Sequence, residues 1–327
     1  MHLYMTGGRQ RGNLFKNDKE WRWFERGLIV RLDTETGSGE VCVEYDTPLD
    51  ARPDGQSSVC FKCATIEGDR FYTCTSTEIL VYQLPAFHKI GYVSLPCFND
   101  VHHVTHTPQG HLLVASTGLD MVVEVTLDGR VLREWSAVGE DPWQRFSKEI
   151  DYRKVLSTKP HKAHPNFVFT LGDDLWVTRC DLKDAICLTH DAQRIAIDLQ
   201  CVHDGHLFND KVYFTTIDGN LVTADQKSHR VVEAIDLKMI GNNGGAALGF
   251  CRGLLVLDEN TAWIGFTRFR HTEFREKVSW IKHGLQNIHK PTHLALYDLA
   301  ARKCLQEINL EEYGMNAIFS ILPGPLP

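Results

Sequence analysis

One short apolar strand pattern recurs six times along the chain, and this repeat limits the possible folds more than any other feature of the sequence. Each copy alternates apolar and polar residues, is rich in β-branched and aromatic side chains, and is followed by a second strand pattern with a polar turn. The copies begin at Leu3, Phe71, Leu112, Leu175, Val212 and Ala262. A repeating unit of roughly 40–50 residues with this pattern is typical of the blades of a β-propeller.

The clearest repeat spans residues 102–136, "HHVTHTPQGHLLVASTGLDMVVEVTLDGRVLREWS". Its "PQG" and "LDG" segments predict turns, so the unit is expected to be a four-stranded antiparallel meander. Six such units account for nearly all of the chain, and six is within the usual range of roughly four to eight propeller blades. The pattern therefore predicts an all-β fold, a six-bladed β-propeller.

The two ends of the chain complement each other. The first repeat lacks its leading strand, whereas "YGMNAIFSILPG" at the C-terminus supplies a strand with no blade to follow it. We expect the C-terminal strand to complete the N-terminal blade, because closure removes free strand edges that would otherwise pair with other chains. Residues 1–327 are thus predicted to form a single propeller domain.

Residues 102–136 resemble a blade of the NHL, SMP-30/gluconolactonase and arylsulfotransferase-like propellers, in which blades of the type "xHHxxxxPxGxLLVxxxxxxxVxEVxxxGxVxxEW" are common. The resemblance implies the propeller architecture and is weaker outside this unit. The calcium-binding carboxylates and asparagines of gluconolactonase-like members have no clear counterpart set here.

Composition narrows the range of partners. A net charge of −7 without clustered Lys or Arg argues against a nucleic-acid or anionic-membrane partner. No apolar stretch approaches the length of about 18 residues that a membrane span needs. The first residues have no apolar signal-peptide region, so we expect a cytoplasmic protein whose 10 cysteines are mostly buried free thiols. The "CFKC" segment (Cys60, Cys63) has no second ligand pair at zinc-site spacing and is interpreted as structural.

Two insertions interrupt the repeat, at residues 137–163 and 271–292. Long insertions in compact repeats are often lids or binding loops, although surface decoration or an oligomer contact fits them equally well.

The sequence His-x-x-His occurs three times, each time in the loop that leads into the first strand of a repeat. These pairs are His103 and His106, His161 and His164, and His203 and His206. In a propeller the leading strands line the central channel, so one histidine from each pair is expected to reach the axis. Imidazoles converging from separate rigid strands make a good transition-metal site.

We therefore predict that His103, His164 and His206 bind a divalent transition metal, Fe or Zn. The supporting and catalytic residues predicted around them are Asp100, His106, His161, His203 and Asp204. The substrate-binding residues predicted from other lead-in loops are Asn242, Asn243, Tyr313 and Asn316.

The predicted function is a metal-dependent enzyme acting on a small molecule at the propeller axis, by lyase, hydrolase or oxygenase chemistry. Without a metal, the same imidazoles could serve as general acid and base. The alternative is a non-catalytic propeller for ligand sensing or protein–protein interaction, in which the histidines only tie loops to neighbouring blades.

Overall fold

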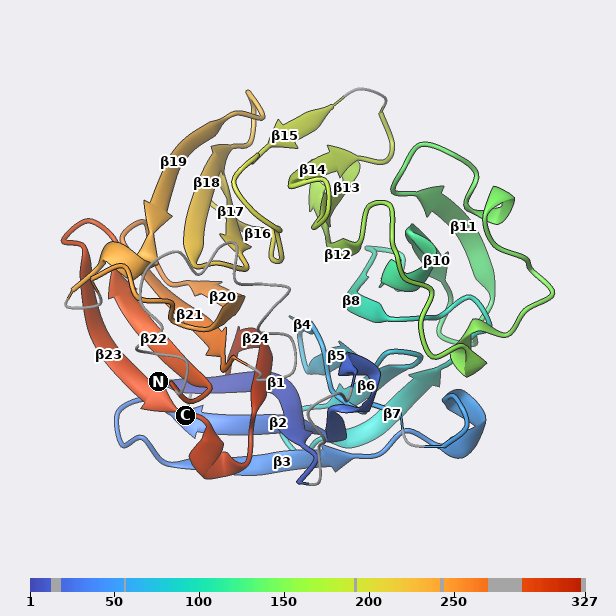
Figure 1. Cartoon of the computed structure of the whole chain (residues 1–327), viewed down its shortest axis with the longest axis horizontal. Helices are drawn as coiled ribbons and strands as arrows, with labels where there is room; N and C mark the ends of the chain where they lie inside the picture. The colour runs from blue at the N-terminus through green and yellow to red at the C-terminus, as the bar shows by residue number, and fades with distance from the viewer. Residues whose placement is uncertain (13–18, 56, 191–192, 242–243, 270–289, 325–327) are drawn as a thin grey trace.

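Six four-stranded antiparallel sheets surround a central axis in the computed structural model of the chain (Figure 1), which describes residues 1–12, 19–55, 57–190, 193–241, 244–269 and 290–324. This arrangement confirms the predicted all-β, six-bladed propeller. Among the described residues, no helix has the length and apolar character required to cross a membrane.

Blade 1 is built from both ends of the chain. Its strand order is β24, β1, β2, β3, so the C-terminal strand is innermost and pairs antiparallel with the N-terminal one. The strands are β24 (Ala317–Pro323), β1 (His2–Gln10), β2 (Phe24–Asp33) and β3 (Gly39–Tyr45). At Gly7 a Cβ atom would lie 1.8 Å from the carbonyl oxygen of Ala317, so the close pairing needs glycine. The predicted closure is confirmed, and the two termini lie close together (Figure 1).

The other five blades follow one another along the chain, each with its first strand nearest the axis (Figure 1). Blade 2 consists of β4 (Thr65–Glu67), β5 (Arg70–Cys74), β6 (Ile79–Gln83) and β7 (His88–Val93), and blade 3 of β8 (Val101–His106), β9 (Leu112–Ser116), β10 (Met121–Val125) and β11 (Val131–Ser136). Blade 4 consists of β12 (Pro165–Leu171), β13 (Asp174–Arg179), β14 (Asp184–Cys187) and β15 (Arg194–Ala196). Blade 5 consists of β16 (His206–Phe208), β17 (Lys211–Thr216), β18 (Asn220–Asp225) and β19 (Val231–Asp236), and blade 6 of β20 (Phe250–Val256), β21 (Thr261–Thr267), β22 (His293–Asp298) and β23 (Lys303–Asn309).

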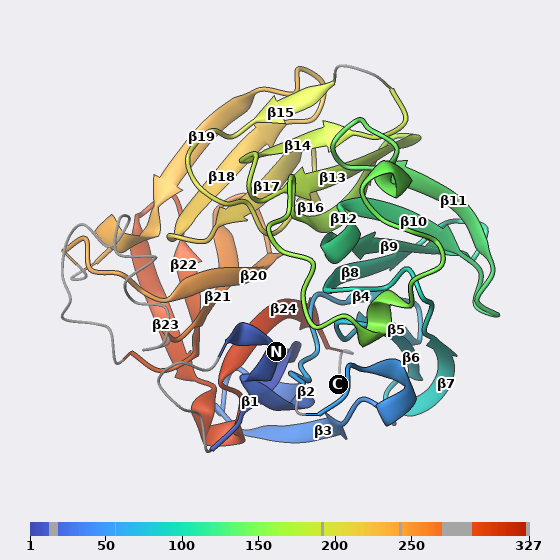
Figure 2. The same ribbon diagram turned by 45° about the vertical axis from the view of Figure 1, so that its right-hand side comes forward.

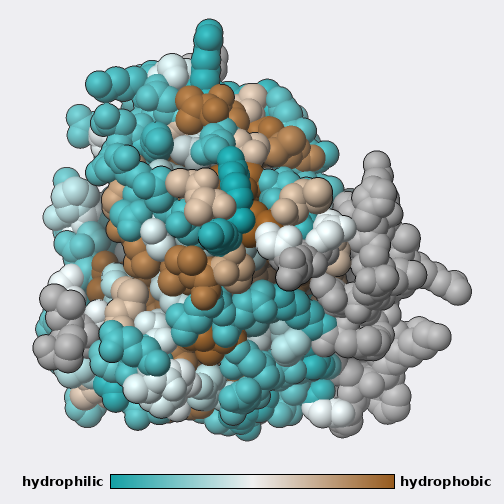
Figure 3. All heavy atoms as spheres, turned by 90° about the vertical axis from the view of Figure 1, so that its left-hand side faces the viewer, coloured by the Kyte–Doolittle hydropathy of each residue, from teal (hydrophilic) through white to brown (hydrophobic). Residues whose placement is uncertain are grey.

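The hydrophobic core lies between neighbouring blades. In β9, Leu112 and Val114 pack toward blade 2, whereas the alternate residues Leu113 and Ala115 pack toward blade 4. Strands buried on both faces read as continuous apolar runs, which explains the repeated pattern of the sequence. On the outer face in Figure 3, apolar side chains are interspersed among hydrophilic ones.

Short 3-10 helices occupy several connections between strands. They are η1 (Glu20–Arg22), η2 (Leu49–Ala51), η3 (Thr117–Leu119), η4 (Pro142–Gln144), η5 (Tyr152–Lys154), η6 (Leu237–Met239) and η9 (Glu311–Tyr313).

The insertion of residues 137–163 contains η4 and η5 and reaches across from blade 3 toward the connection between blades 1 and 2 (Figure 2). Lys154 Nζ anchors it there by donating to the carbonyl oxygens of Leu49 at 2.7 Å and Arg52 at 2.9 Å. Most of the second predicted insertion, residues 270–289, lies outside the described residues.

The cysteines differ from the expectation of free thiols at one pair. Cys180 and Cys201 form a disulfide, and the other eight cysteines are free. The two partners are 21 residues apart in sequence. They come together because Cys180 directly follows the second strand of blade 4 and Cys201 lies in the loop that leads into blade 5.

Candidate functional site

A cavity of about 770 Å³ opens on the face formed by the lead-in loops, and each blade contributes one side chain to its base. We call these six residues the axis ring: they are Lys62, His102, Asn166, His203, Arg252 and Phe319. They occupy matching positions at or just before the innermost strand of their blades.

β-bulges explain how several of these side chains reach the axis. In blade 3 the register between β8 and β9 shifts between Val101 and His103, so that His102 is the extra residue. Similar shifts occur at Asn166, Arg252 and Phe319. A bulge redirects a side chain that a regular strand would place elsewhere.

The residue after His102 lies between blades and not in the cavity. His103 is 1% exposed and its ring stacks on Phe167 at 3.8 Å between centroids. Its Nδ1 accepts from the Val168 backbone N–H at 3.0 Å, and its Nε2 is 3.2 Å from Thr65 Oγ1. Both ring nitrogens are thus engaged, and burial lowers the pKa of His103 to about 3. His102 takes the position at the cavity that the sequence prediction gave to His103.

His206 and His106 also lie outside the lining of the cavity. The His206 ring packs on Phe167 at 4.9 Å, and its Nε2 is 3.8 Å from Asp204 Oδ1. His106 Nε2 is 3.2 Å from the carboxylate of Glu67 near the edge of blade 2. The structure therefore does not gather His103, His164 and His206 into one set of ligands, because strand geometry directs them to different surroundings.

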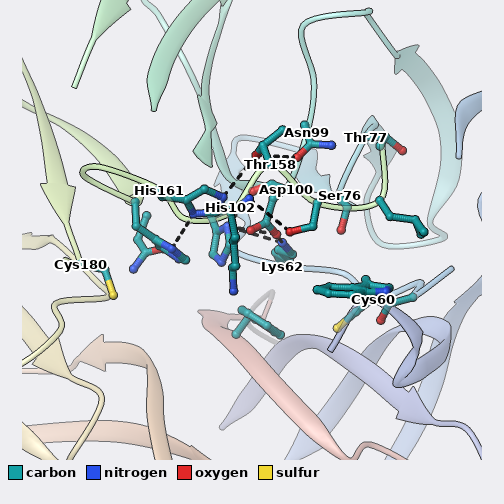
Figure 4. A pocket seen from close by; sticks show the side chains of 18 of the residues that line it. Cys60, Lys62, Ser76, Thr77, Asn99, Asp100, His102, Thr158, His161 and Cys180 are labelled. Atoms are coloured by element: carbon teal, nitrogen blue, oxygen red, sulfur yellow. Dashed lines mark hydrogen bonds and ion pairs between the residues drawn. The ribbon is translucent and has the colours of Figure 1, made fainter. Parts of the chain in front are cut away.

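A different set of ligand atoms does converge at the cavity wall. One carboxylate oxygen of Asp100 and one ring nitrogen each of His161 and His164 all lie within 4.8 Å of one another. We call this set the Asp100 group. Nδ1 of His161 is 2.9 Å from Nδ1 of His164, and Nε2 of His161 is 3.4 Å from Thr158 Oγ1 (Figure 4). Asp100 and His164 have left-handed backbones, with φ of 50° and 57°. Such conformations in non-glycine residues tend to cluster at functional sites.

Asp120 holds the loop that carries the two histidines. Its Oδ1 accepts from the backbone N–H groups of Ala163 at 3.0 Å and His164 at 2.9 Å. Its Oδ2 accepts from the Lys162 N–H at 2.8 Å and from Arg145 at 2.7 Å. The carboxylate is 2% exposed, so the loop that leads into blade 4 is fixed by a buried charged group on blade 3.

Charges around the Asp100 group favour an ionised carboxylate. Burial alone raises the pKa of Asp100, but the adjacent ammonium of Lys62 and then His102 and His164 hold this pKa well below its ordinary value. Burial lowers the pKa of His164 and of His102 well below that of free histidine, and the charge of Lys62 adds to both shifts. The imidazole of His164 is therefore neutral near pH 7, as metal ligation requires.

The tautomer of His102 follows from its backbone contact. Its Nδ1 is 2.7 Å from the carbonyl oxygen of Asp100, which can only accept, so Nδ1 carries the hydrogen. Nε2 then carries the lone pair. The His102 ring lies 5.1 Å from that of His164 and 6.3 Å from that of His203, between centroids, so His102 links the Asp100 group to the axis ring.

Below the cavity, Cys63, His203 and Asp204 form a second group of potential ligands. Asp204 accepts from Thr215 Oγ1 and from the Gly253 N–H, and its Oδ2 is 3.7 Å from His203 Nδ1, beyond hydrogen-bonding distance. Burial raises the pKa of Asp204, but the neighbouring imidazoles of His203 and His206 favour the carboxylate and produce a net decrease. Burial raises the pKa of the Cys63 thiol well above its ordinary value, which disfavours the thiolate that metal binding needs.

The third group that the described residues form is Asp174, Cys187 and His190, at the outer part of blade 4. His190 is 65% exposed and contacts the carboxylate of Asp174. This group is remote from the axis ring, since none of its members lines the cavity.

The predicted substrate-binding residues are not gathered at the cavity. Asn242 and Asn243 lie outside the described residues. The Tyr313 hydroxyl donates to the carbonyl oxygen of Gly37, and Asn316 Oδ1 accepts from the Gln10 N–H at 2.9 Å. Both side chains serve contacts within blade 1 and its loops, and neither lines the cavity.

Sequence reasoning missed five of the six axis-ring residues, His102 included, and predicted only His203. The available signal was their shared register, since "FKC", "VHH", "PNF", "VHD", "CRG" and "IFS" occupy equivalent points of the six repeats. Lys62, Asn166, Arg252 and Phe319 stand at these points beside the two histidines.

Comparison with solved structures finds other proteins with a similar fold. A protein of unknown function from Bacteroides caccae has a TM-score of 0.64 and 14% identity, over 98% of this chain and 97% of that one. A streptogramin B lyase has a TM-score of 0.51 and 12% identity, over 97% of this chain and 91% of that one. Virginiamycin B lyase from Staphylococcus aureus has a TM-score of 0.46 and 14% identity, over 80% of this chain and 84% of that one. No family model and no curated protein matches the chain. At these identities the likenesses show the fold.

Proposed function

We propose that the chain is a metal-dependent enzyme acting on a small molecule in the axial cavity, with Asp100, His161 and His164 as ligands of a divalent transition metal, Fe or Zn. The observation that carries this proposal is the convergence of their three ligand atoms within 4.8 Å at the cavity wall.

The spacing of these atoms fits a metal site after a small adjustment. Two nitrogen ligands of a tetrahedral metal at about 2.0–2.1 Å are separated by about 3.3 Å. The Nδ1 atoms of His161 and His164 are 2.9 Å apart, so an increase of a few tenths of an ångström would bring them to that separation. Both Asp100 and His164, which bring ligand atoms to this point, have left-handed backbones.

The donor set of two imidazoles and one carboxylate leaves coordination positions for substrate and water. This combination suits non-haem iron as well as zinc, which agrees with lyase, hydrolase or oxygenase chemistry. A bound metal would supply Lewis acidity to a substrate oxygen. The streptogramin B lyase, whose fold is similar, supports the view that a propeller of this kind can perform lyase chemistry.

The surrounding residues would position the substrate and move its protons. His102 holds the hydrogen on Nδ1 through the Asp100 carbonyl, so its Nε2 can accept a proton from a substrate bound between the Asp100 group and the axis ring. Lys62 keeps Asp100 ionised. Trp21, Phe24 and Phe319 give the cavity an apolar wall that limits the access of water.

The test is a metal titration of protein purified without a histidine tag and treated with a chelator. Isothermal titration with Zn²⁺, and with Fe²⁺ under anaerobic conditions, should show one equivalent that is lost in a His161→Ala/His164→Ala variant. His111→Ala is the matched control, because His111 pairs with Glu124 at 2.8 Å outside the cavity and should bind metal like the wild type. Unchanged metal binding in the double variant, or none in the wild type, would favour the non-catalytic alternative.

A further inference from the structure

The axis ring has an unusual charge composition for the base of a cavity in an acidic protein. The six side chains include two cations, Lys62 and Arg252, two imidazoles, an amide and a phenyl ring, and none of the six is acidic. The whole chain has a net charge of −7. We propose that the axis ring binds an oxyanion group of the substrate, a carboxylate or a phosphate.

The two cations come from blades 2 and 6, which lie on either side of blade 1 (Figure 1). The guanidinium carbon of Arg252 lies 4.8 Å from the centroid of the Phe319 ring. Guanidinium groups form paired hydrogen bonds with carboxylates and phosphates. Lys62 Nζ lies 3.4 Å from His102 Nδ1, next to the Asp100 group.

Several buried polar atoms of the axis ring have no hydrogen-bond partner among the described residues. Both ring nitrogens of His203 and Oδ1 of Asn166 are in this state, and the two residues are 2% and 1% exposed. Leaving such groups unpaired costs about 1–3 kcal/mol each. A bound ligand would satisfy them, because a neutral imidazole can donate one hydrogen to an anion and the amide oxygen can accept from a substrate hydroxyl.

The walls above the axis ring carry both cations and carboxylates. Arg52 and Lys159 line the cavity, and the carboxylates that line it are Asp100 and Asp181. Cations therefore outnumber carboxylates by four to two among the described residues of the lining. Charge of one sign in a cavity with low-dielectric walls focuses the field and attracts ligands of the opposite sign.

Oxyanion binding by the axis ring would define the substrate class of the enzyme proposed above. The reaction of such a substrate rests on the proposed function, whereas anion binding itself does not. An anion held by Arg252 and His203 would extend toward Lys62 and the Asp100 group. The axis ring would thus fix one end of the substrate and leave the other end near the proposed metal.

The experiment measures anion binding in chelator-treated, full-length protein. The thermal unfolding midpoint is followed with inorganic phosphate or malonate, at constant ionic strength balanced with sodium chloride. A ligand that binds the folded state raises this midpoint in a concentration-dependent way. We expect a saturable rise with at least one of the two anions, and comparison of the two separates a phosphate site from a carboxylate site.

Variants connect the effect to the axis ring. Arg252→Gln should weaken the binding about tenfold or more, and Arg252→Lys should weaken it less because it keeps the charge. Arg302→Gln is the control, since Arg302 pairs with Glu233 at 2.7 Å on the outer surface. General stabilisation by salts would be equal in all of these proteins.

The two proposals can fail separately. The His161→Ala/His164→Ala variant should lose metal and keep anion binding, which would support the axis ring independently of the metal. No saturable effect of either anion on the wild type would overturn the inference even if Arg252→Gln fails to fold. Equal anion binding by wild type and a folded Arg252→Gln variant would also overturn it.

Discussion

Replacement of Asp120 tests whether one buried carboxylate holds the histidine loop in place. Asp120 accepts hydrogen bonds from three backbone N–H groups of residues 162–164 and from Arg145, at distances of 2.7–3.0 Å. Asp120→Ala removes all four interactions and places alanine at a φ of 50°, which is unfavourable for a residue without a polar side chain. Asp120→Asn keeps the shape and tolerates this backbone.

The size of the effect follows from the groups left without partners. Removing one member of a buried ion pair costs about 3–5 kcal/mol, and we expect Asp120→Ala to lower the free energy of unfolding by that amount. In Asp120→Asn, Oδ1 can still accept from Ala163 and His164, but the new NH₂ group faces the donors of Lys162 and Arg145. Two of four interactions are lost, so we expect a decrease of about 2–3 kcal/mol.

Urea unfolding followed by tryptophan fluorescence gives these free energies, and metal titration of the same proteins reports the geometry of the loop. Asp141→Asn is the control, because the exposed side chain of Asp141 accepts from the Trp143 N–H at 2.9 Å and an asparagine side chain can accept the same bond. A loss below about 1 kcal/mol in Asp120→Ala, with normal metal affinity, would refute the assignment of this positioning role.

Three further predictions concern stability. Burial lowers the pKa of His293 to about 4. As the pH falls, His293 is therefore protonated in the unfolded chain before it is protonated in the folded one. The free energy of unfolding is highest above pH 6.5 and decreases toward pH 4. At pH 5 the free energy of unfolding should be about 2 kcal/mol lower than at pH 7.5. Urea unfolding at the two pH values should show this difference in the wild type and not in His293→Gln. The Cys180–Cys201 disulfide closes a loop with a sequence separation of 21 residues. Cys180→Ser/Cys201→Ser, or reductant added to the wild type, should lower the free energy of unfolding by about 3 kcal/mol. A free energy of unfolding that neither change lowers would contradict the stabilising role of the disulfide. Gly7→Ala would place its Cβ 1.8 Å from a carbonyl oxygen of the closing strand, so it should lower the free energy of unfolding by at least about 3 kcal/mol. Gly12→Ala is the control, because there is open space around Gly12. Thermal unfolding should show a lower midpoint for Gly7→Ala and an unchanged one for Gly12→Ala.

The fold was predictable because each blade repeats the same short apolar strand pattern. Leu112 to Ala115 are all apolar because successive side chains pack against two different neighbouring blades, and this apolar run is visible in the sequence. The closing strand was predictable because the chain ends with a strand pattern that its first repeat lacks.

The candidate site was predictable only to the level of the lead-in loops. His161, His164 and His203 do line the cavity, but the choice between His102 and His103 depends on a bulge after Val101. A single inserted residue reverses which side chain faces the axis, and no residue type in this segment signals it.

The contribution of Asp120 could not be read from the sequence either. It lies 44 residues before His164, and its contacts depend on how the insertion of residues 137–163 returns to blade 4. Long-range polar contacts of this kind follow from the tertiary arrangement and not from local propensity.

The most direct test of the proposed metal centre is anomalous diffraction from crystals of tag-free protein grown with Zn²⁺, or with Fe²⁺ under anaerobic conditions. Our account predicts an anomalous peak within about 2.0–2.2 Å of one oxygen of Asp100 and one nitrogen each of His161 and His164. Absence of density there, with metal found only at Cys63, His203 and Asp204 or at Asp174, Cys187 and His190, would contradict it.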